Sequence, residues 1–167
     1  IRENVTCHYN AAIPLGDDIE LIATTLWAHI PLQDAFRTEA VISDFRRIRY
    51  GVEPLDFNRF NDEHYRCFKF LRESVSSSKA KHIIVATHHV PSFELMSPEF
   101  KGSDLNGAFT VELGDYIAAS PIEYWIYGHS HRNIDKVIGN TQCISNQLGY
   151  VFSNEHQDFS HGKYLTI

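Results

Sequence analysis

Residues 124–131 read YWIYGHSH, a short apolar run followed at once by a glycine and two histidines. Residues 83–91 read IIVATHHVP, which repeats the pattern of an apolar run followed by histidines. Both runs are typical of buried strands, and the polar residues after them are typical of loops. In α/β sheets, ligands bind beyond the carboxyl ends of the strands. The two segments therefore predict a metal site built from imidazoles at strand ends.

The elements predicted around these segments alternate between strand and helix. Apolar and β-branched runs predict strands at 4–7, 19–26, 83–86, 124–127, 134–138, 142–145 and 164–167. Helices are predicted at 39–48, from a cap at Asn61 to the serines at 76–78, and from a cap at Thr110 to about residue 119. The alternation predicts an α/β or α+β sheet domain, and no linker divides residues 1–167. His64, on the amphipathic second helix, is expected to be structural.

Composition and charge restrict the functions that the chain can have. The formal net charge of −6 argues against an electrostatic grip on nucleic acid. The three cysteines are widely spaced and form no CxxC pair, which favours reduced thiols and a cytoplasmic protein. Apolar stretches of transmembrane length are absent from the sequence, so a membrane partner is not expected.

Taken together, the histidine segments resemble the calcineurin-like metallophosphoesterases. THHVPS (87–92) and GHSH (128–131) look like the two carboxyl-terminal signature blocks of that family. IATTLW (22–27) and LNGAF (105–109) resemble two further stretches of it. The resemblance covers the whole chain and implies part of a four-layer α/β/β/α sandwich with mixed sheets.

The resemblance also implies roles for individual residues. His88 and His129 would bind one metal ion and His131 the other, whereas His89 and Asn106 would lie near the substrate. The two divalent ions, Mn, Fe, Zn or Ni, would bridge a hydroxide that attacks a phosphoester. The implied substrate is a small-molecule phosphomonoester or phosphodiester.

One departure from the family pattern is large. The Asp-x-His, Gly-Asp-x-x-Asp and Gly-Asn-His-Asp/Glu blocks of the family do not occur in this sequence. We therefore expect the chain to be the carboxyl-terminal portion of such a domain, catalytically incomplete without an amino-terminal segment. No residue of this chain is assigned as catalytic, and residues 1–167 alone are expected to be poorly soluble.

Two alternatives remain open at this point. A non-catalytic binding or scaffold module could keep the fold without the chemistry, which would account for the missing aspartate blocks. A mononuclear zinc hydrolase acting on amides also uses an H-x-H pair, but it needs further histidines and an aspartate at later strand ends.

Overall fold

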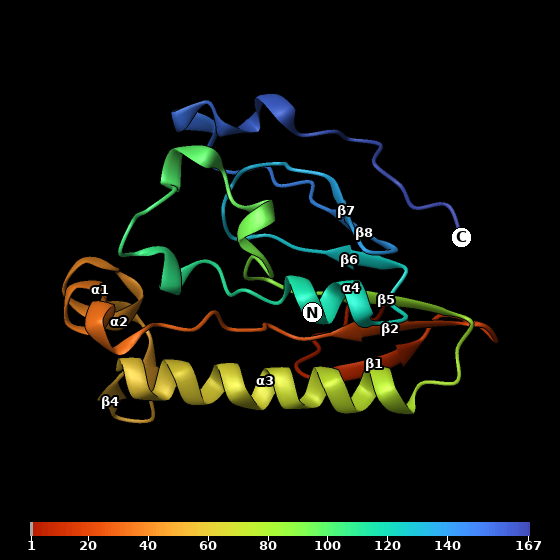
Figure 1. Cartoon of the computed structure of the whole chain (residues 1–167), viewed down its shortest axis with the longest axis horizontal. Coiled ribbons are helices and arrows are strands. Elements are labelled where there is room, and N and C mark those ends of the chain that lie inside the picture. The colour runs from red at the N-terminus through yellow and green to blue at the C-terminus, as the bar shows by residue number, and fades with distance from the viewer. Residues whose placement is uncertain (1) are drawn as a thin grey trace.

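The computed structural model describes residues 2–167 and centres on a six-stranded mixed sheet (Figure 1). In spatial order the strands are β1 (Ala11–Pro14), β2 (Ile19–Ala23), β5 (His82–Ala86), β6 (Tyr124–Ile126), β8 (Thr141–Ile144) and β7 (Lys136–Ile138). The four central strands are parallel, and the two edge strands pair antiparallel. The predicted class of mixed α/β structure is confirmed.

Four α-helices and several short elements connect the strands. The helices are α1 (Ala35–Val41), α2 (Asp44–Arg47), α3 (Phe57–Ser77) and α4 (Gly114–Ala119), and β3 (Arg49–Tyr50) pairs with β4 (Glu53–Pro54). The 3-10 turns are η1 (Leu32–Asp34), η2 (Phe93–Leu95), η3 (Pro98–Phe100), η4 (Asn106–Ala108), η5 (Val151–Ser153) and η6 (Glu155–Asp158). Figure 1 shows α3 along one side of the sheet and the carboxyl-terminal segment on the opposite side of the view.

Several predicted boundaries are wrong in the first half of the chain. The strand expected at 4–7 lies instead at Ala11–Pro14, where it forms a hairpin with β2 across the turn at Gly16. The strand expected to reach Leu26 ends at Ala23. The single helix expected at 39–48 is two helices, because the backbone is extended at Ile42 and interrupts the helical hydrogen bonds.

The predicted caps are also corrected. Helix α3 begins after Asp56, whose carboxylate accepts the Arg59 amide hydrogen, and not at Asn61. Helix α4 begins at Gly114, four residues after Thr110, and the Glu112 carboxylate accepts the Gly114 amide hydrogen.

The last predicted strand is absent as well. Residues 164–167 form no strand in the described part of the chain, although the Thr166 carbonyl accepts a hydrogen bond from the Tyr124 hydroxyl.

The two faces of the sheet differ in how they are covered. One row of aligned side chains is completely buried against α3 and α4 and consists of Ile22, Val85, Trp125 and Cys143. Alternate strand residues point to the opposite face. That face carries Leu21, Ile84, Ile126 and Ile144, and its edge residue Val137 is 61% exposed.

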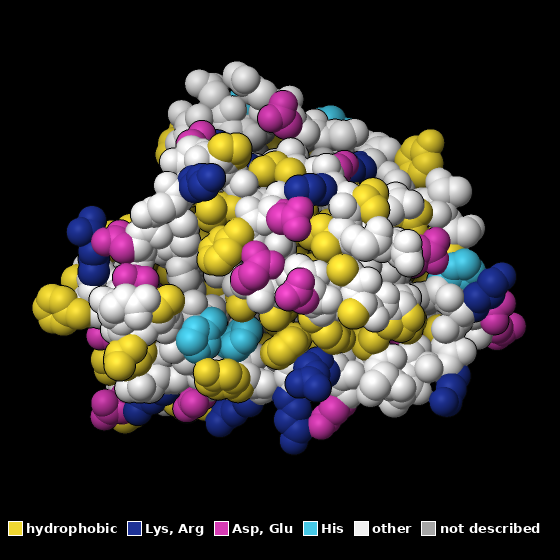
Figure 2. All heavy atoms as spheres, in the orientation of Figure 1, with side chains coloured by type: hydrophobic (Ala, Val, Ile, Leu, Met, Phe, Trp, Pro, Cys, Tyr) yellow, Lys and Arg dark blue, Asp and Glu magenta, His cyan; other side chains and the backbone are white. Residues whose placement is uncertain are grey.

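An apolar groove also runs between α3 and α4, where Figure 2 shows hydrophobic side chains gathered. Phe68, Val75, Ile83 and Tyr116 line it, and none of its lining residues is a histidine. The groove is therefore separate from the predicted metal site.

Among residues 2–167, none of the helices combines the length and apolar character needed to cross a bilayer. Cys67 and Cys143 are buried thiols and Cys7 is an exposed one, and none of the three forms a disulfide.

Candidate metal centre

The loops after β5 and β6 are joined by backbone hydrogen bonds that continue the sheet. The Thr87 amide donates to the Ile126 carbonyl at 2.8 Å, and the Gly128 amide donates to the His88 carbonyl at 3.0 Å. The Thr87 hydroxyl accepts the Trp125 indole hydrogen and donates to the His89 carbonyl. These bonds fix both histidine segments relative to a buried strand pair, which is how a rigid site is built.

Three imidazoles meet where the two loops join. The ring centroids of His88 and His129 are 4.6 Å apart, and those of His89 and His129 are 4.3 Å apart with nearly parallel planes. One ring nitrogen from each of the three residues lies within 4.8 Å of the others. The structure therefore brings His88, His89 and His129 together, whereas His131, the third predicted ligand, is not part of this group.

His129 is held in a strained, half-buried position. Its φ of 71° lies in the left-handed region, which is uncommon for a residue with a side chain and is often found at functional sites. Burial, followed by the charge of His88, lowers the pKa of His129 to about 4, and a hydrogen bond to the Ala108 carbonyl acts in the opposite direction. Because a carbonyl only accepts, the bonded ring nitrogen carries the proton and the other nitrogen keeps a free lone pair.

His88 is the exposed member of the group. Desolvation lowers the pKa of its imidazole, and the negative charge of Asp44 opposes that shift. Within residues 2–167 its ring has no hydrogen-bond partner. The side chain thus offers a lone pair of a neutral imidazole at neutral pH, which is the form that binds metal ions.

His131 is oriented by a carboxylate. Its Nδ1 lies 2.8 Å from Oε2 of Glu155, and the Tyr150 amide hydrogen leads the contacts that lower the pKa of Glu155. An ionised carboxylate only accepts, so Nδ1 of His131 donates and Nε2 is left with its lone pair. A histidine that donates its second nitrogen to a carboxylate in this way is the usual arrangement at metal sites.

Close backbone packing allows this contact. Gly149 has a φ of 62°, and a side chain there would collide with the Glu155 Cβ at 2.6 Å. His131 also has a left-handed φ, of 53°, so GHSH contains two strained histidines.

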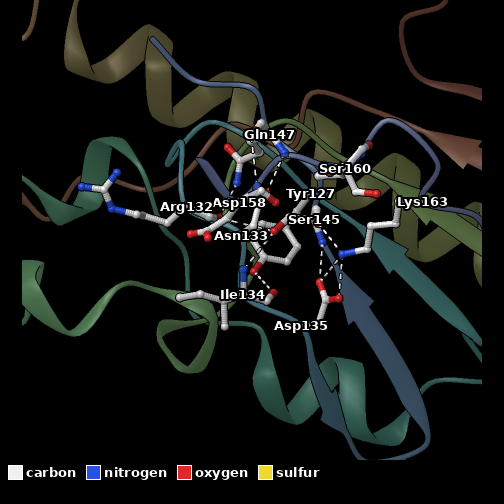
Figure 3. Close-up of polar contacts among 11 residues, drawn as sticks. Tyr127, Arg132, Asn133, Ile134, Asp135, Ser145, Gln147, Asp158, Ser160 and Lys163 are labelled. Atoms are coloured by element: carbon white, nitrogen blue, oxygen red, sulfur yellow. Dashed lines mark hydrogen bonds and ion pairs between the residues drawn. The ribbon is translucent and has the colours of Figure 1, made fainter. Parts of the chain in front are cut away.

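A polar network holds the loop that carries these histidines (Figure 3). The Gln147 side chain accepts from the His131 amide and donates to the Arg132 carbonyl, at 2.8 and 2.7 Å. The side chain of Asn133 accepts a hydrogen bond from the backbone amide of Gln147 and donates one to the backbone carbonyl of Gln147. Farther along, Lys163 reaches both carboxylate oxygens of Asp135, so the carboxyl-terminal segment is tied to the same loop (Figure 3).

His89 differs from the other imidazoles because its acceptor nitrogen is already in use. The Ala28 amide donates to Nδ1 of His89 at 2.8 Å in a buried contact. A neutral imidazole has one acceptor nitrogen, so Nε2 of His89 carries the proton. Burial and the charges of three neighbouring histidines lower the pKa of His89 well below its ordinary value, which keeps the ring neutral. In this state Nε2 of His89 presents an N–H donor and not a lone pair.

Asn106, predicted to lie near the substrate, forms loop contacts. Its amide donates to the Phe100 carbonyl at 2.8 Å, and its own carbonyl accepts from Phe109 and Thr110. The loop reaches the histidines through the Ala108 carbonyl and through Phe109, whose ring stacks on His129 at 5.0 Å.

Sequence reasoning missed Glu155, Gln147 and the Ala28 amide. No spacing pattern identifies them, because each reaches a histidine only after the chain has folded.

Comparison with known proteins finds distant similarity. No protein-family model matches the sequence. It is 28% identical over 165 residues to Uncharacterized protein L509 of Acanthamoeba polyphaga mimivirus, and the match covers 90% of this chain and 56% of that protein. The chain thus spans about half the length of that relative. A solved crystal structure aligns with a TM-score of 0.48 and 13% identity, over 83% of this chain and 44% of the other.

Proposed function

We propose that this chain is part of a metal-dependent phosphoester hydrolase with a dinuclear centre. The observation that carries the proposal is the pair of free imidazole lone pairs on His88 and His129, whose rings lie side by side at the carboxyl ends of adjacent parallel strands, with His131 two residues farther along the second loop. His131 lies outside the group of close ring nitrogens formed by His88, His89 and His129, so we propose that it binds a second ion.

The donor set fits a divalent transition metal. Neutral imidazole suits Zn, Fe, Ni and, with added oxygen ligands, Mn. In the proposed arrangement His88 and His129 hold one ion and His131 holds the other. Two such ions would polarise the phosphoester and supply a nucleophile at neutral pH.

The residues of this chain have positioning roles in that chemistry. The Ala108 carbonyl orients His129, and Glu155 orients His131. Gln147 fixes the backbone that joins them. Such outer contacts set the direction of each lone pair, which a metal site requires.

Carboxylate ligands would come from a further part of the complete protein. In residues 2–167 the ligand group consists of histidines and contains no Asp or Glu. On the sheet face opposite α3, Val137 is 61% exposed whereas Ile84 is already buried within residues 2–167, so a second sheet would pack against the exposed part of this face. We therefore propose the four-layer α/β/β/α sandwich, with the acidic ligands on the second sheet.

The proposal is tested by assaying the complete protein with Mn²⁺ against bis(4-nitrophenyl) phosphate and 4-nitrophenyl phosphate. We expect hydrolysis of at least one ester, abolished by a chelator and restored by added metal ion. A folded, metal-loaded protein that cleaves neither ester would favour a non-catalytic binding module.

A further inference from the structure

Two buried histidines are bonded to opposite ends of one peptide group. Nδ1 of His64, on α3, lies 2.6 Å from the Trp27 carbonyl oxygen. The Ala28 amide nitrogen lies 2.8 Å from Nδ1 of His89. The Trp27 carbonyl and the Ala28 amide belong to the same peptide bond. A continuous chain of hydrogen bonds therefore runs from α3 to the metal centre.

The direction of every bond in this chain is fixed. The Trp27 carbonyl can only accept, so His64 donates from Nδ1. The Ala28 amide can only donate, so His89 accepts at Nδ1. A hydrogen bond to a peptide carbonyl strengthens the amide as a donor, because hydrogen bonds in a chain polarise one another at low dielectric.

Both histidines are shielded from water. His64 is 5% exposed, His89 is 3% exposed and Ala28 is fully buried. Water therefore competes poorly for these bonds, and each unmet polar group would be costly. The Trp27 ring packs edge-on against Phe60 at 5.0 Å, and Phe60 lies 5.8 Å from the His89 ring. Packing thus holds the ring of His89 in place, while the hydrogen bonds determine which nitrogen carries the proton.

We propose that His64 is a positioning residue that holds His89 as an Nε2–H donor through the Trp27–Ala28 peptide. His89 then donates a hydrogen bond to an anionic oxygen bound beside His88 and His129, with phosphate as the ligand class. This last contact rests on the proposed function, whereas the tautomer of His89 does not.

The position of His89 suits such a donor. Its ring is stacked on His129, and one of its nitrogens lies within 4.8 Å of the nitrogens that His88 and His129 offer. If His89 were a third metal ligand, it would have to give up the hydrogen bond from the Ala28 amide. As a hydrogen-bond donor to the ligand, His89 keeps that bond.

The tautomers can be read directly by long-range ¹H–¹⁵N NMR of the complete protein labelled with ¹⁵N-histidine, without added metal. We expect His89 to show the Nε2–H pattern and His64 the Nδ1–H pattern. A His89 ring protonated at Nδ1 would overturn the proposal, whatever the activity of the protein.

A matched pair of variants tests the role of His64. Asparagine places its amide nitrogen near the Nδ1 position of histidine, and glutamine places it near Nε2. We expect His64→Asn to keep the His89 pattern and His64→Gln to mix the two tautomers. If His64 only fills space, both Asn and Gln should preserve its role. Retention of the wild-type His89 pattern in His64→Gln would therefore overturn the proposal.

Binding of inorganic phosphate to the Mn²⁺-loaded protein tests the donor role of His89. We expect His89→Phe to keep its metal content and to bind phosphate roughly tenfold more weakly, the loss typical of one hydrogen bond to a charged group. Loss of bound metal in His89→Phe would overturn the assignment of His89 as a donor. None of these measurements depends on hydrolytic activity. A failure of this inference can therefore be distinguished from a failure of the proposed function.

Discussion

The strand pair β5 and β6 has a histidine at its amino end as well as histidines at its carboxyl end, and the two ends differ in their partners. At the amino end His82 lies 2.5 Å from the Glu123 carboxylate, a partly exposed pair joining residues 41 apart in sequence. At the carboxyl end His88 and His129 lie beside each other, with no carboxylate bonded to either ring within residues 2–167.

The difference in partners indicates which end of the strand pair is available to bind a metal ion. At the amino end the imidazole of His82 already has the Glu123 carboxylate as its hydrogen-bond partner. Neighbouring imidazoles disfavour each other's protonation, and here the charge of His88 lowers the pKa of His129. A cluster kept neutral in this way presents lone pairs, which a metal cation would satisfy. The amino end is thus a surface ion pair, and the carboxyl end is the candidate site.

The largest expected effect follows from loss of His129, the proposed metal ligand. We predict that His129→Ala lowers phosphodiesterase activity by more than roughly 100-fold, since even the loss of an outer contact costs up to that amount. His82→Ala, at the other end of the same strand pair, is the matched control and should keep full activity. Equal activity in wild-type protein and His129→Ala, with circular dichroism showing that both are folded, would remove the distinction between the two ends.

The second expected effect is a loss of stability in acid. His129 titrates near pH 4 when folded and near its ordinary 6.5 when unfolded, so between these values the unfolded state binds more protons. Stability of the metal-free protein should therefore fall as pH falls from 6.5 to 4, by roughly 3 kcal/mol for this residue.

Urea unfolding at several pH values measures this slope. The variant His129→Asn should show a shallower dependence, because the titrating ring is gone. A wild-type unfolding free energy that does not change between pH 7 and pH 4 would contradict the burial of neutral imidazoles at this end.

A smaller effect is expected from the carboxylate that orients His131. We predict that Glu155→Gln weakens metal binding by about 10- to 100-fold, because the neutral amide no longer favours the proton on Nδ1 of His131. Titration calorimetry with Mn²⁺ measures the affinity, and Glu123→Gln at the amino end is the control. If both variants bind Mn²⁺ equally well, Glu155 has no role at the site.

The smallest effect concerns the ion pair at the amino end. Removing it with His82→Ala should lower the free energy of unfolding by less than about 1 kcal/mol, as is usual for partly exposed pairs. Thermal or urea unfolding at pH 6 measures it. A loss of several kcal/mol would mean that the amino end is a structural anchor and not a simple surface pair.

The sheet core was predictable because its signals are local. The run from Ile83 to Ala86 and the run around Trp125 each form one buried strand, and both deliver histidines as expected. The edges were less predictable. Strand β1 contains Pro14 and half-exposed residues, so its identity depends on pairing with β2 and not on its own composition.

For the site, the sequence indicated which residues lie near one another but not which nitrogen of each ring is available. His88 and His89 are adjacent in the chain, yet the Ala28 amide makes one a donor and leaves the other free. Glu155 follows His131 by 24 positions, with the φ of 62° at Gly149 between them. These assignments depend on tertiary contacts, which local patterns do not encode.

The most direct test of the central claim is a crystal structure of the complete protein grown with Mn²⁺ and measured at the manganese absorption edge. We predict anomalous peaks at two ions, one bonded to His88 and His129 and the other to His131, with the Ala28–His89 bond intact. An absence of anomalous density at these rings in protein saturated with Mn²⁺, or an ion bonded to His89, would contradict it.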